Sequence, residues 1–235
     1  MPTRPRSART AAAALLLGPA VYLTAEAVSA AAWTHPTYSY LHNWISDLGS
    51  STTGTFQGRE IDSPLHQVMN AGFLLQGLLF AIGALAIAGR LPRRVRRTTT
   101  ALTVATAIGY ALLAVFHGSP QAAEDGSLAL HYLGATLAIL GANALAIVLG
   151  VHWWNDPAHR SLGHASVPLG VLGLVAVVVL FSTTNSGLPA GLIERVSVYT
   201  AVVWQVRVAL HLLLAGRRIP GPDAGARRGV LAAAH

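Results

Sequence analysis

Six apolar runs, each near the length that crosses a bilayer, constrain the fold of this chain more than any other feature. A transmembrane helix needs about 20 predominantly apolar residues. Only 11% of the residues are charged, against about 25% in soluble domains. We therefore predict an all-α integral membrane bundle of six transmembrane helices. The predicted spans are residues 10–33, 65–88, 98–116, 128–151, 165–181 and 192–214.

The first apolar run follows a short basic N-terminus, residues 1–9, and this combination also describes a signal peptide. The run is long for a signal sequence and leads into a polytopic chain, so we interpret it as a retained helix. Residues 10–215 form the predicted transmembrane domain, which carries a polar loop at residues 34–64. Residues 216–235 are predicted to be a basic disordered tail, because they are rich in Gly, Pro and Arg.

The distribution of arginine predicts the orientation of the bundle. All sixteen basic residues are Arg: three precede the first span, five follow the second, one follows the fourth and four lie in the tail. Six spans place these segments on one side of the membrane, and the positive-inside rule assigns that side to the cytoplasm. We therefore predict a multi-pass cell-membrane protein with both termini cytoplasmic and the polar loop outside. The same pattern accounts for the net charge of +7 without a nucleic-acid partner.

Motifs for metals and cofactors are missing from the sequence. Cysteine is absent, which excludes disulfides, thiolate nucleophiles and cysteine metal sites. His117 and His131 flank the connection between the third and fourth spans, and with Asp47 they would form a ligand set suited to zinc. Their spacing matches no signature such as HExxH. We predict no metal and, without a nucleotide-binding loop or nucleophile elbow, no cofactor.

The polar loop contains local patterns that indicate turns. Asp47 followed by Gly49 predicts a turn in which Asp47 bonds backbone amides and Gly49 takes positive φ. Ser63 followed by Pro64 is typical of a helix N-cap and first helical position. Of the residues in this loop pattern, Asp47 is the one that turn formation explains least. We expect its carboxylate to contact either a substrate or Arg195.

Ionisable side chains in the spans are unfavourable by about 2.5–3.5 kcal/mol each on insertion scales, so each needs a reason. Glu26 lies in the outer third of the first span, either as an acid with a raised pKa or as a structural hydrogen-bond partner. Glu194 and Arg195 open the sixth span and, as sequence neighbours, do not face each other. Arg195 would either hold an anionic head group or pin the loop. Asn70 is predicted to form an interhelical hydrogen bond, and Gln76 receives no role.

The loop motif resembles a known family. The residues that carry the similarity run to the mouth of the second span: Tyr38, Ser39, Asn43, Ile45, Ser46, Asp47, Leu48, Gly49, Ser63 and Pro64. They are similar to the signature of the prokaryotic membrane family labelled domain of unknown function 998, and His131 and the Glu194-Arg195 pair also resemble its pattern. The family tends to have Phe-Pro and a nearby acid after the third span, where this chain has Phe116-His117-Gly118.

A more distant similarity concerns the same motif. It resembles the Ile-Ser-Asp-Thr-Gly element of the eukaryotic family that contains the glycolipid-anchor remodelling factor and the damage-regulated autophagy modulators. That resemblance implies lipid-related work at an outer or lumenal face, by analogy alone.

Two functions remain open. In the first, an outer-face polar pocket binds a membrane lipid, an isoprenoid or another hydrophobic small molecule and acts on it by acid–base chemistry. Proton-initiated cyclisation or isomerisation and head-group hydrolysis are the two versions considered. In the second, the protein is a non-catalytic scaffold, sensor or small-molecule permease, and the polar cluster pins the outer loop.

The candidate residues are shared between these two hypotheses. The lipid bilayer is a partner in both, and the sequence does not indicate an oligomeric state. The candidate catalytic residues are Asp47, His131, Glu194 and Glu26. The candidate substrate-binding residues are Arg195, Ser46, Asn43, Tyr38 and His117.

Overall fold

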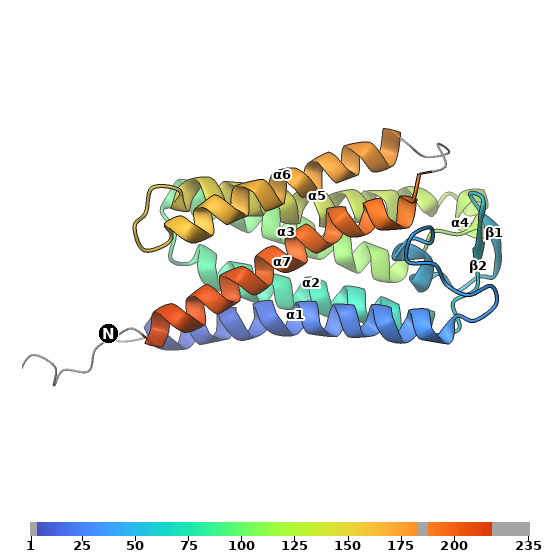
Figure 1. The fold of residues 1–235 in the computed structure, drawn as a ribbon, viewed down its shortest axis with the longest axis horizontal. Coiled ribbons are helices and arrows are strands. Elements are labelled where there is room, and N and C mark those ends of the chain that lie inside the picture. The colour runs from blue at the N-terminus through green and yellow to red at the C-terminus, as the bar shows by residue number, and fades with distance from the viewer. Residues whose placement is uncertain (1–3, 183–187, 218–235) are drawn as a thin grey trace, which may run out of the picture.

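A computed structural model describes residues 4–182 and 188–217 of the chain (Figure 1). In that part the elements are α1 (Arg4–Ala32), η1 (Ser46–Gly49), β1 (Gly54–Phe56), β2 (Arg59–Ile61), α2 (His66–Ala88), α3 (Arg93–Val115), α4 (Pro120–Asp125), α5 (Leu128–Trp153), α6 (Arg160–Ser182) and α7 (Ala190–Arg217). The predicted disordered tail lies, from residue 218 onward, outside the described residues.

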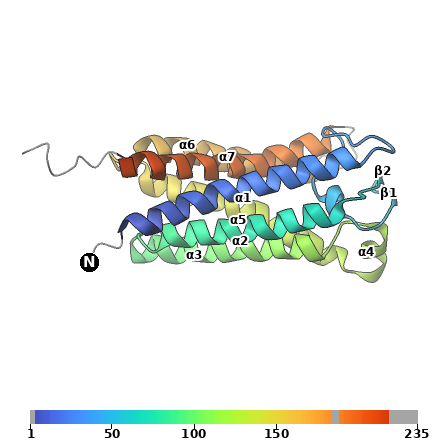
Figure 2. The ribbon, with the colours of Figure 1, turned by 90° about the horizontal axis from the view of Figure 1, so that it is seen from below.

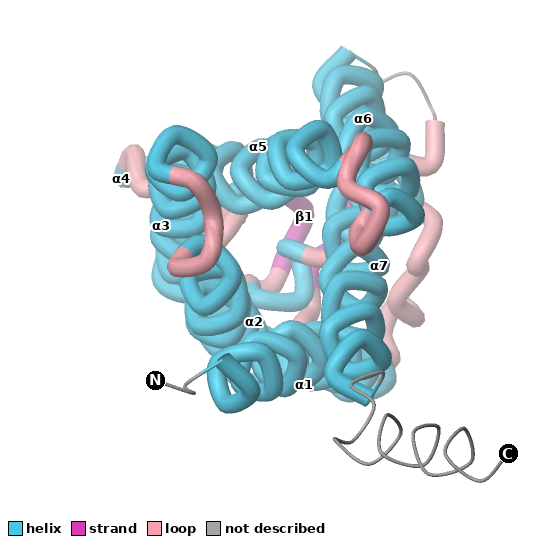
Figure 3. The backbone as a smooth tube through the Cα atoms, turned by 90° about the vertical axis from the view of Figure 1, so that its left-hand side faces the viewer, coloured by secondary structure: helices cyan, strands magenta, loops and turns pink. Residues whose placement is uncertain are grey.

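The six long helices form a closed ring in chain order. Each packs against the next along the chain, α5 follows α3 around the ring, and α7 closes onto α1. Figure 3 looks along this ring from the end at which α1 begins. We call that end, where α7 also finishes, the terminal end, and the opposite end the loop end. The polar loop, the β-hairpin and the short helix α4 all lie at the loop end (Figure 2).

The predicted six-helix membrane bundle is confirmed. Six helices in the described residues are long and apolar enough to cross a membrane. Several extend beyond the predicted apolar runs: α3 begins at Arg93 and α6 at Arg160. Hydropathy marks the apolar middle of a span, whereas a helix continues into its polar flanks as long as its backbone hydrogen bonds are made.

The connection between α1 and α2 folds into the open end of the ring. Ile45 and Leu48 are buried, and the 3₁₀ turn η1 contacts α1, α2 and α3. After this turn β1 and β2 pair as an antiparallel hairpin. Gln57 and Gly58 at its tip both have positive φ, as a two-residue hairpin turn of this hand requires. The hydrophobic pattern did not predict the hairpin, because three-residue strands show no readable alternation.

Two local predictions in this connection are wrong. Gly49 ends η1, and among the residues that the structure describes positive φ occurs elsewhere, at Gln57, Gly54, Gly58 and Gly126. A side chain at position 49 would instead collide with the Asn70 amide, so close packing requires the glycine. The Ser63 hydroxyl does not cap α2, which begins at His66; it donates to the Leu48 carbonyl oxygen at 2.6 Å.

The interior divides into two packed clusters along the ring. The cluster at the terminal end is built mainly from alanine and leucine, with the large rings of Phe80, Trp153 and Trp204. The cluster at the loop end is richer in tyrosine and includes Tyr22, Tyr38 and Tyr110. Hydroxyl-bearing rings suit that end, because the polar loop and its neighbours supply partners for them there.

Candidate functional site

Asp47 joins the 3₁₀ turn to the β-hairpin. Its Oδ2 accepts hydrogen bonds from Arg59 Nε at 2.9 Å and from the Trp44 backbone N–H at 2.8 Å, and its Oδ1 accepts from Arg59 Nη2 at 3.1 Å. The Arg59 guanidinium also lies 4.5 Å from the centroid of the Trp44 ring. Two parallel hydrogen bonds between a guanidinium and a carboxylate fix both the distance between the two groups and their relative orientation. Of the two alternatives expected for Asp47, a substrate or Arg195, the second is wrong: Asp47 is paired with Arg59, twelve residues further along the same loop.

Arg195 forms a second ion pair, deep in the bundle, with Glu26. Arg195 Nε donates to Glu26 Oε1 at 3.0 Å, and the Tyr199 hydroxyl donates to Glu26 Oε2 at 2.6 Å. Both carboxylate oxygens of Glu26 thus have a partner. Glu26 and Arg195 are 1% and 4% exposed, so the pair links α1 to α7 away from water. Its stability depends on these extra hydrogen bonds, since burial of two charges is otherwise unfavourable.

The same guanidinium also holds the polar loop. Arg195 Nη1 donates to the backbone oxygens of Tyr40 at 2.8 Å, Asn43 at 3.0 Å and Gly191 at 3.0 Å. Arg195 Nη2 donates to the Tyr38 hydroxyl. These contacts pin the first part of the loop to the start of α7.

Tyr38 connects Arg195 to a later part of the loop through two hydrogen bonds of its hydroxyl. Its hydroxyl accepts from Arg195 and donates to the Trp44 carbonyl oxygen at 2.9 Å. Burial raises the pKa of the Tyr38 hydroxyl well above its ordinary value, so the group keeps the proton that it donates. The Asn43 side chain accepts from the Ser39 backbone N–H at 3.0 Å. Tyr38 and Asn43, both predicted to bind substrate, are therefore engaged in the loop itself.

Glu194 points to a different environment from that of its neighbour Arg195. Its Oε2 accepts a hydrogen bond from the Ile45 backbone N–H at 2.5 Å. The residue also lines a small cavity beneath the loop, together with Ser46, His131 and Trp44. Three of the predicted site residues, Ser46, His131 and Glu194, thus come together there, and Asp47 does not line the cavity.

This cavity has a polar end and an apolar wall. It encloses about 40 Å³, and its wall is completed by side chains of α5 and α6 that include Ile139, Val177 and Phe181. A neighbouring void of about 30 Å³ shares Ser46, Ala135, Ile139 and Glu194. Since about 10–15 Å³ holds one water molecule, the two voids together fit a few waters or the end of a hydrocarbon chain.

His131 is held in one tautomer. Its Nδ1 lies 2.9 Å from the Phe116 carbonyl oxygen, which only accepts hydrogen bonds, so Nδ1 carries a proton. In the neutral ring the basic nitrogen is then Nε2. The residue is 4% exposed, and the Tyr132 ring packs against it with centroids 5.9 Å apart. A neutral histidine fixed in this way is equipped to accept a proton.

His117 lies apart from this cavity, on the side of α2. Its Nε2 is 2.9 Å from Asn70 Nδ2, which also donates to the Gly49 carbonyl oxygen at 3.0 Å. Burial lowers the pKa of His117, so the ring favours its neutral form. The partners of Asn70 lie in η1 and in the connection after α3, and not on another spanning helix as predicted. Within the described residues, no three His, Asp or Glu side chains are grouped to hold a metal ion.

Two contacts were missed by sequence reasoning. Arg59 was given no role, although it holds Asp47. Gln76 received no role, yet it is fully buried, and its Nε2 donates to Gln205 Oε1 at 3.1 Å. The sequence did contain a sign of this contact, since each of two apolar spans has an amide side chain near its middle. Such amides commonly form hydrogen bonds with polar groups on other helices.

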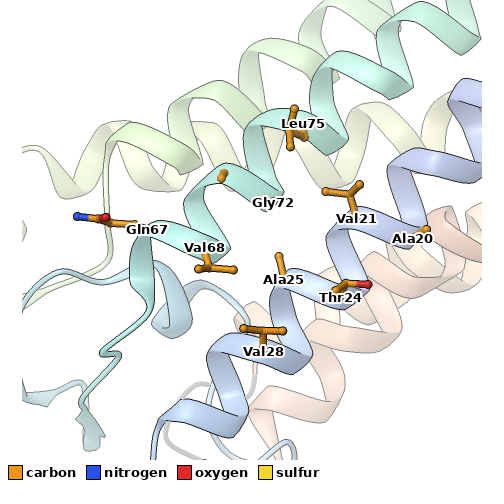
Figure 4. A pocket seen from close by; sticks show the side chains of 10 residues that line it. Ala20, Val21, Thr24, Ala25, Val28, Gln67, Val68, Gly72 and Leu75 are labelled. Carbon is orange, nitrogen blue, oxygen red and sulfur yellow. The ribbon is translucent and has the colours of Figure 1, made fainter.

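A wider hollow on the side of the bundle carries none of these groups. It is a groove of about 560 Å³ between α1 and α2, lined by residues between Ala20 and Val28 on one helix and between Gln67 and Leu75 on the other (Figure 4). Thr24 and Gln67 are its polar side chains, and none of its lining residues is charged. Chemistry is therefore better sought in the smaller cavity beneath the loop.

Comparison with known proteins gives one match. The profile of a family described as "Protein of unknown function (DUF998)" matches residues 11–211, which include most of every one of the six long helices. No curated protein and no solved structure matches the chain.

Proposed function

The chain belongs to the DUF998 family of proteins of unknown function, and from this premise we propose that it binds a membrane lipid or isoprenoid at its loop end and acts on it with an acid–base pair, Glu194 and His131. The observation that carries the proposal is the cavity that these two side chains share. Most of its remaining lining is apolar, so a hydrocarbon chain would enter with its reactive end toward the two polar groups.

The chemistry follows from the two groups. A protonated Glu194 would donate its proton to an alkene carbon of an isoprenoid, and Nε2 of His131 would remove a proton from a neighbouring carbon. The double bond then moves or a ring closes, and the number of protons on the substrate is unchanged. The rings of Trp44 and Tyr132 in the cavity wall would stabilise the cationic intermediate. In head-group hydrolysis the same pair would instead activate water and protonate the leaving group.

The remaining candidates serve the site indirectly in this proposal. Asp47 with Arg59, and Glu26 with Arg195, hold the loop that roofs the cavity. Ser46 lines the cavity from the loop side. The arginine distribution supports an orientation with the loop end outside the cell and both termini in the cytoplasm.

A non-catalytic role as a scaffold, sensor or permease is the second candidate. The observation that favours it is that Asp47, Glu26 and Arg195 are all engaged in contacts between protein groups. The small volume of the cavity, about 40 Å³, also suits a structural interior better than a site for a whole lipid. In this role the polar cluster would only fasten the loop.

The amount of lipid that the purified protein retains distinguishes the lipid-binding function from the non-catalytic role. We would purify the full chain from membranes in a mild detergent and quantify bound hydrophobic molecules by mass spectrometry. Ala135→Val narrows both voids and His131→Gln removes the proposed base; Ala129→Val changes the exposed face of the same helix and is the control. We expect the first two variants to lose a specific molecule by about tenfold and the control to retain it.

Equal lipid contents in all variants would contradict the proposal. If all three variants are folded, elute as the unaltered protein does and carry the same lipids in the same amounts, the cavity is not a ligand site. The loop-fastening role then explains the polar cluster without further chemistry.

A further inference from the structure

A second cavity with ionisable walls lies at the terminal end of the bundle, on the opposite side of the molecule from the polar loop. It encloses about 220 Å³ between the ends of α2, α5 and α7 and the start of α6. Five ionisable residues line it: Arg90, His152, Asp156, His159 and His211. No residue of the loop-end site contributes to it.

His159 is positioned by three neighbours. Its Nδ1 bonds Asp156 Oδ2 at 2.7 Å, its ring stacks on Trp153 with centroids 5.8 Å apart, and the His211 ring lies 5.1 Å away. The hydrogen bond from His159 lowers the pKa of Asp156, helped by a second from the Ala158 backbone N–H. The carboxylate of Asp156 in turn orients the imidazole of His159 through this hydrogen bond.

The wall offers hydrogen-bond donors that suit an anion. One guanidinium and three imidazoles line the cavity, and its single carboxylate is paired with His159. Further arginines lie at the same end of the bundle, at the starts of α3 and α6. A guanidinium and imidazole N–H groups around one cavity can all donate hydrogen bonds to a bound anion.

Three further observations narrow the kind of ligand. The remaining wall includes the apolar side chains Leu91, Leu162 and Val208, which strengthen electrostatic attraction by excluding water. The volume is below the roughly 300–1,000 Å³ of pockets for drug-sized ligands, so a compact group fits. A metal ion is not favoured, since no metal-binding group of three His, Asp or Glu exists among the described residues.

We infer that this cavity binds a phosphate group, either as a free phosphate or as a phospholipid head group, with Arg90 and the three histidines as its donors. Arginine presents two parallel donors to phosphate oxygens, and each imidazole N–H can add a further hydrogen bond. This site would operate independently of the proposed lipid chemistry at the loop end.

The test is a titration of the purified full chain in detergent with inorganic phosphate, followed by thermal unfolding and by direct calorimetry. Sodium chloride at matched ionic strength is the reference. Arg90→Gln and His152→Gln remove donors from the wall, and Arg97→Gln removes the same charge from an exposed position on α3 outside the cavity. A parallel arm measures binding to bilayers of phosphatidic acid in phosphatidylcholine against phosphatidylcholine alone.

We expect saturable binding that Arg90→Gln weakens by about tenfold and His152→Gln by less, with Arg97→Gln near the unaltered protein. Binding of phosphatidic acid but not of inorganic phosphate would identify a lipid head group as the ligand, and the reverse would identify a free phosphate. The inference is overturned if neither probe gives a saturable effect beyond matched chloride. Equal weakening by Arg90→Gln and Arg97→Gln would also overturn it, because net charge alone would then explain the attraction.

Discussion

The two halves of the bundle bury different kinds of polar group. Among the described residues, every buried side chain that carries a charge or an imidazole lies at the loop end: Glu26, Asp47, His131, Glu194 and Arg195. Away from that end the buried polar side chains are neutral, and they include Thr99, Thr103, Ser166 and Gln205.

The neutral half shows what such a bundle needs in order to pack. Thr103 and Ser166 bond the carbonyl oxygens one turn earlier in their own helices, and the Trp204 indole donates to the Ser166 hydroxyl at 3.0 Å. Helices of this size therefore associate through small residues and neutral hydrogen bonds. Of the buried charges in the loop half, Glu26 and Arg195 join α1 to α7 and also hold the loop. We attribute the others to the loop and its site.

Within the loop half a further contrast separates neighbours in sequence. Arg195 has its donors engaged by Glu26, Tyr38 and loop carbonyls, so it fastens the loop. Glu194 takes one backbone hydrogen bond and lines the cavity. Stability and ligand binding should therefore respond to different substitutions.

The largest effect is expected from Arg195→Leu. The change leaves Glu26 buried without its counter-ion, and breaking one side of a buried pair typically destabilises by about 3–5 kcal/mol. Denaturant titration in mixed micelles measures the loss. Arg207→Leu, at an exposed position on the same helix, is the matched control and should change stability by about 1 kcal/mol or less. Equal losses in the two variants would show that the buried pair has no special role.

A smaller effect is expected from Asp47→Asn. The substitution removes the ionic character of the two bonds to Arg59, and hydrogen bonds to charged groups contribute about 1.5–3 kcal/mol. We expect that loss of stability and faster proteolysis within residues 34–64. A double-mutant cycle with Arg59→Gln should give a coupling energy above about 0.5 kcal/mol. Additive losses, with no coupling, would place the function of Asp47 elsewhere.

The sequence allowed the bundle to be predicted because hydropathy reports position across a membrane. An apolar run of about 20 residues has few alternatives to a spanning helix. Hydropathy does not report how far each helix is rotated about its axis, so it could not pair Glu26 with Arg195, which are 169 positions apart. The pairing also depends on the loop, whose carbonyls complete the contacts of the guanidinium.

The loop itself was predicted least well, for a related reason. Its path depends on tertiary contacts such as that of Gly49 with Asn70, and not on a repeating pattern. Asp47 was singled out as a candidate, but turn chemistry could not show that Arg59 would return to it across a short hairpin. For Glu194 and His131, the sequence indicated the end of the bundle at which they lie but not that they share a cavity.

The most direct test of the division between fastening and site residues is the Glu194→Gln variant, with stability and retained lipid measured on the same preparation. The glutamine carbonyl still accepts from the Ile45 N–H, so we predict a change in unfolding free energy of about 1 kcal/mol or less. We predict at the same time loss of the specific bound molecule, because the acid in the cavity is gone. Unchanged stability together with an unchanged lipid complement would contradict the account.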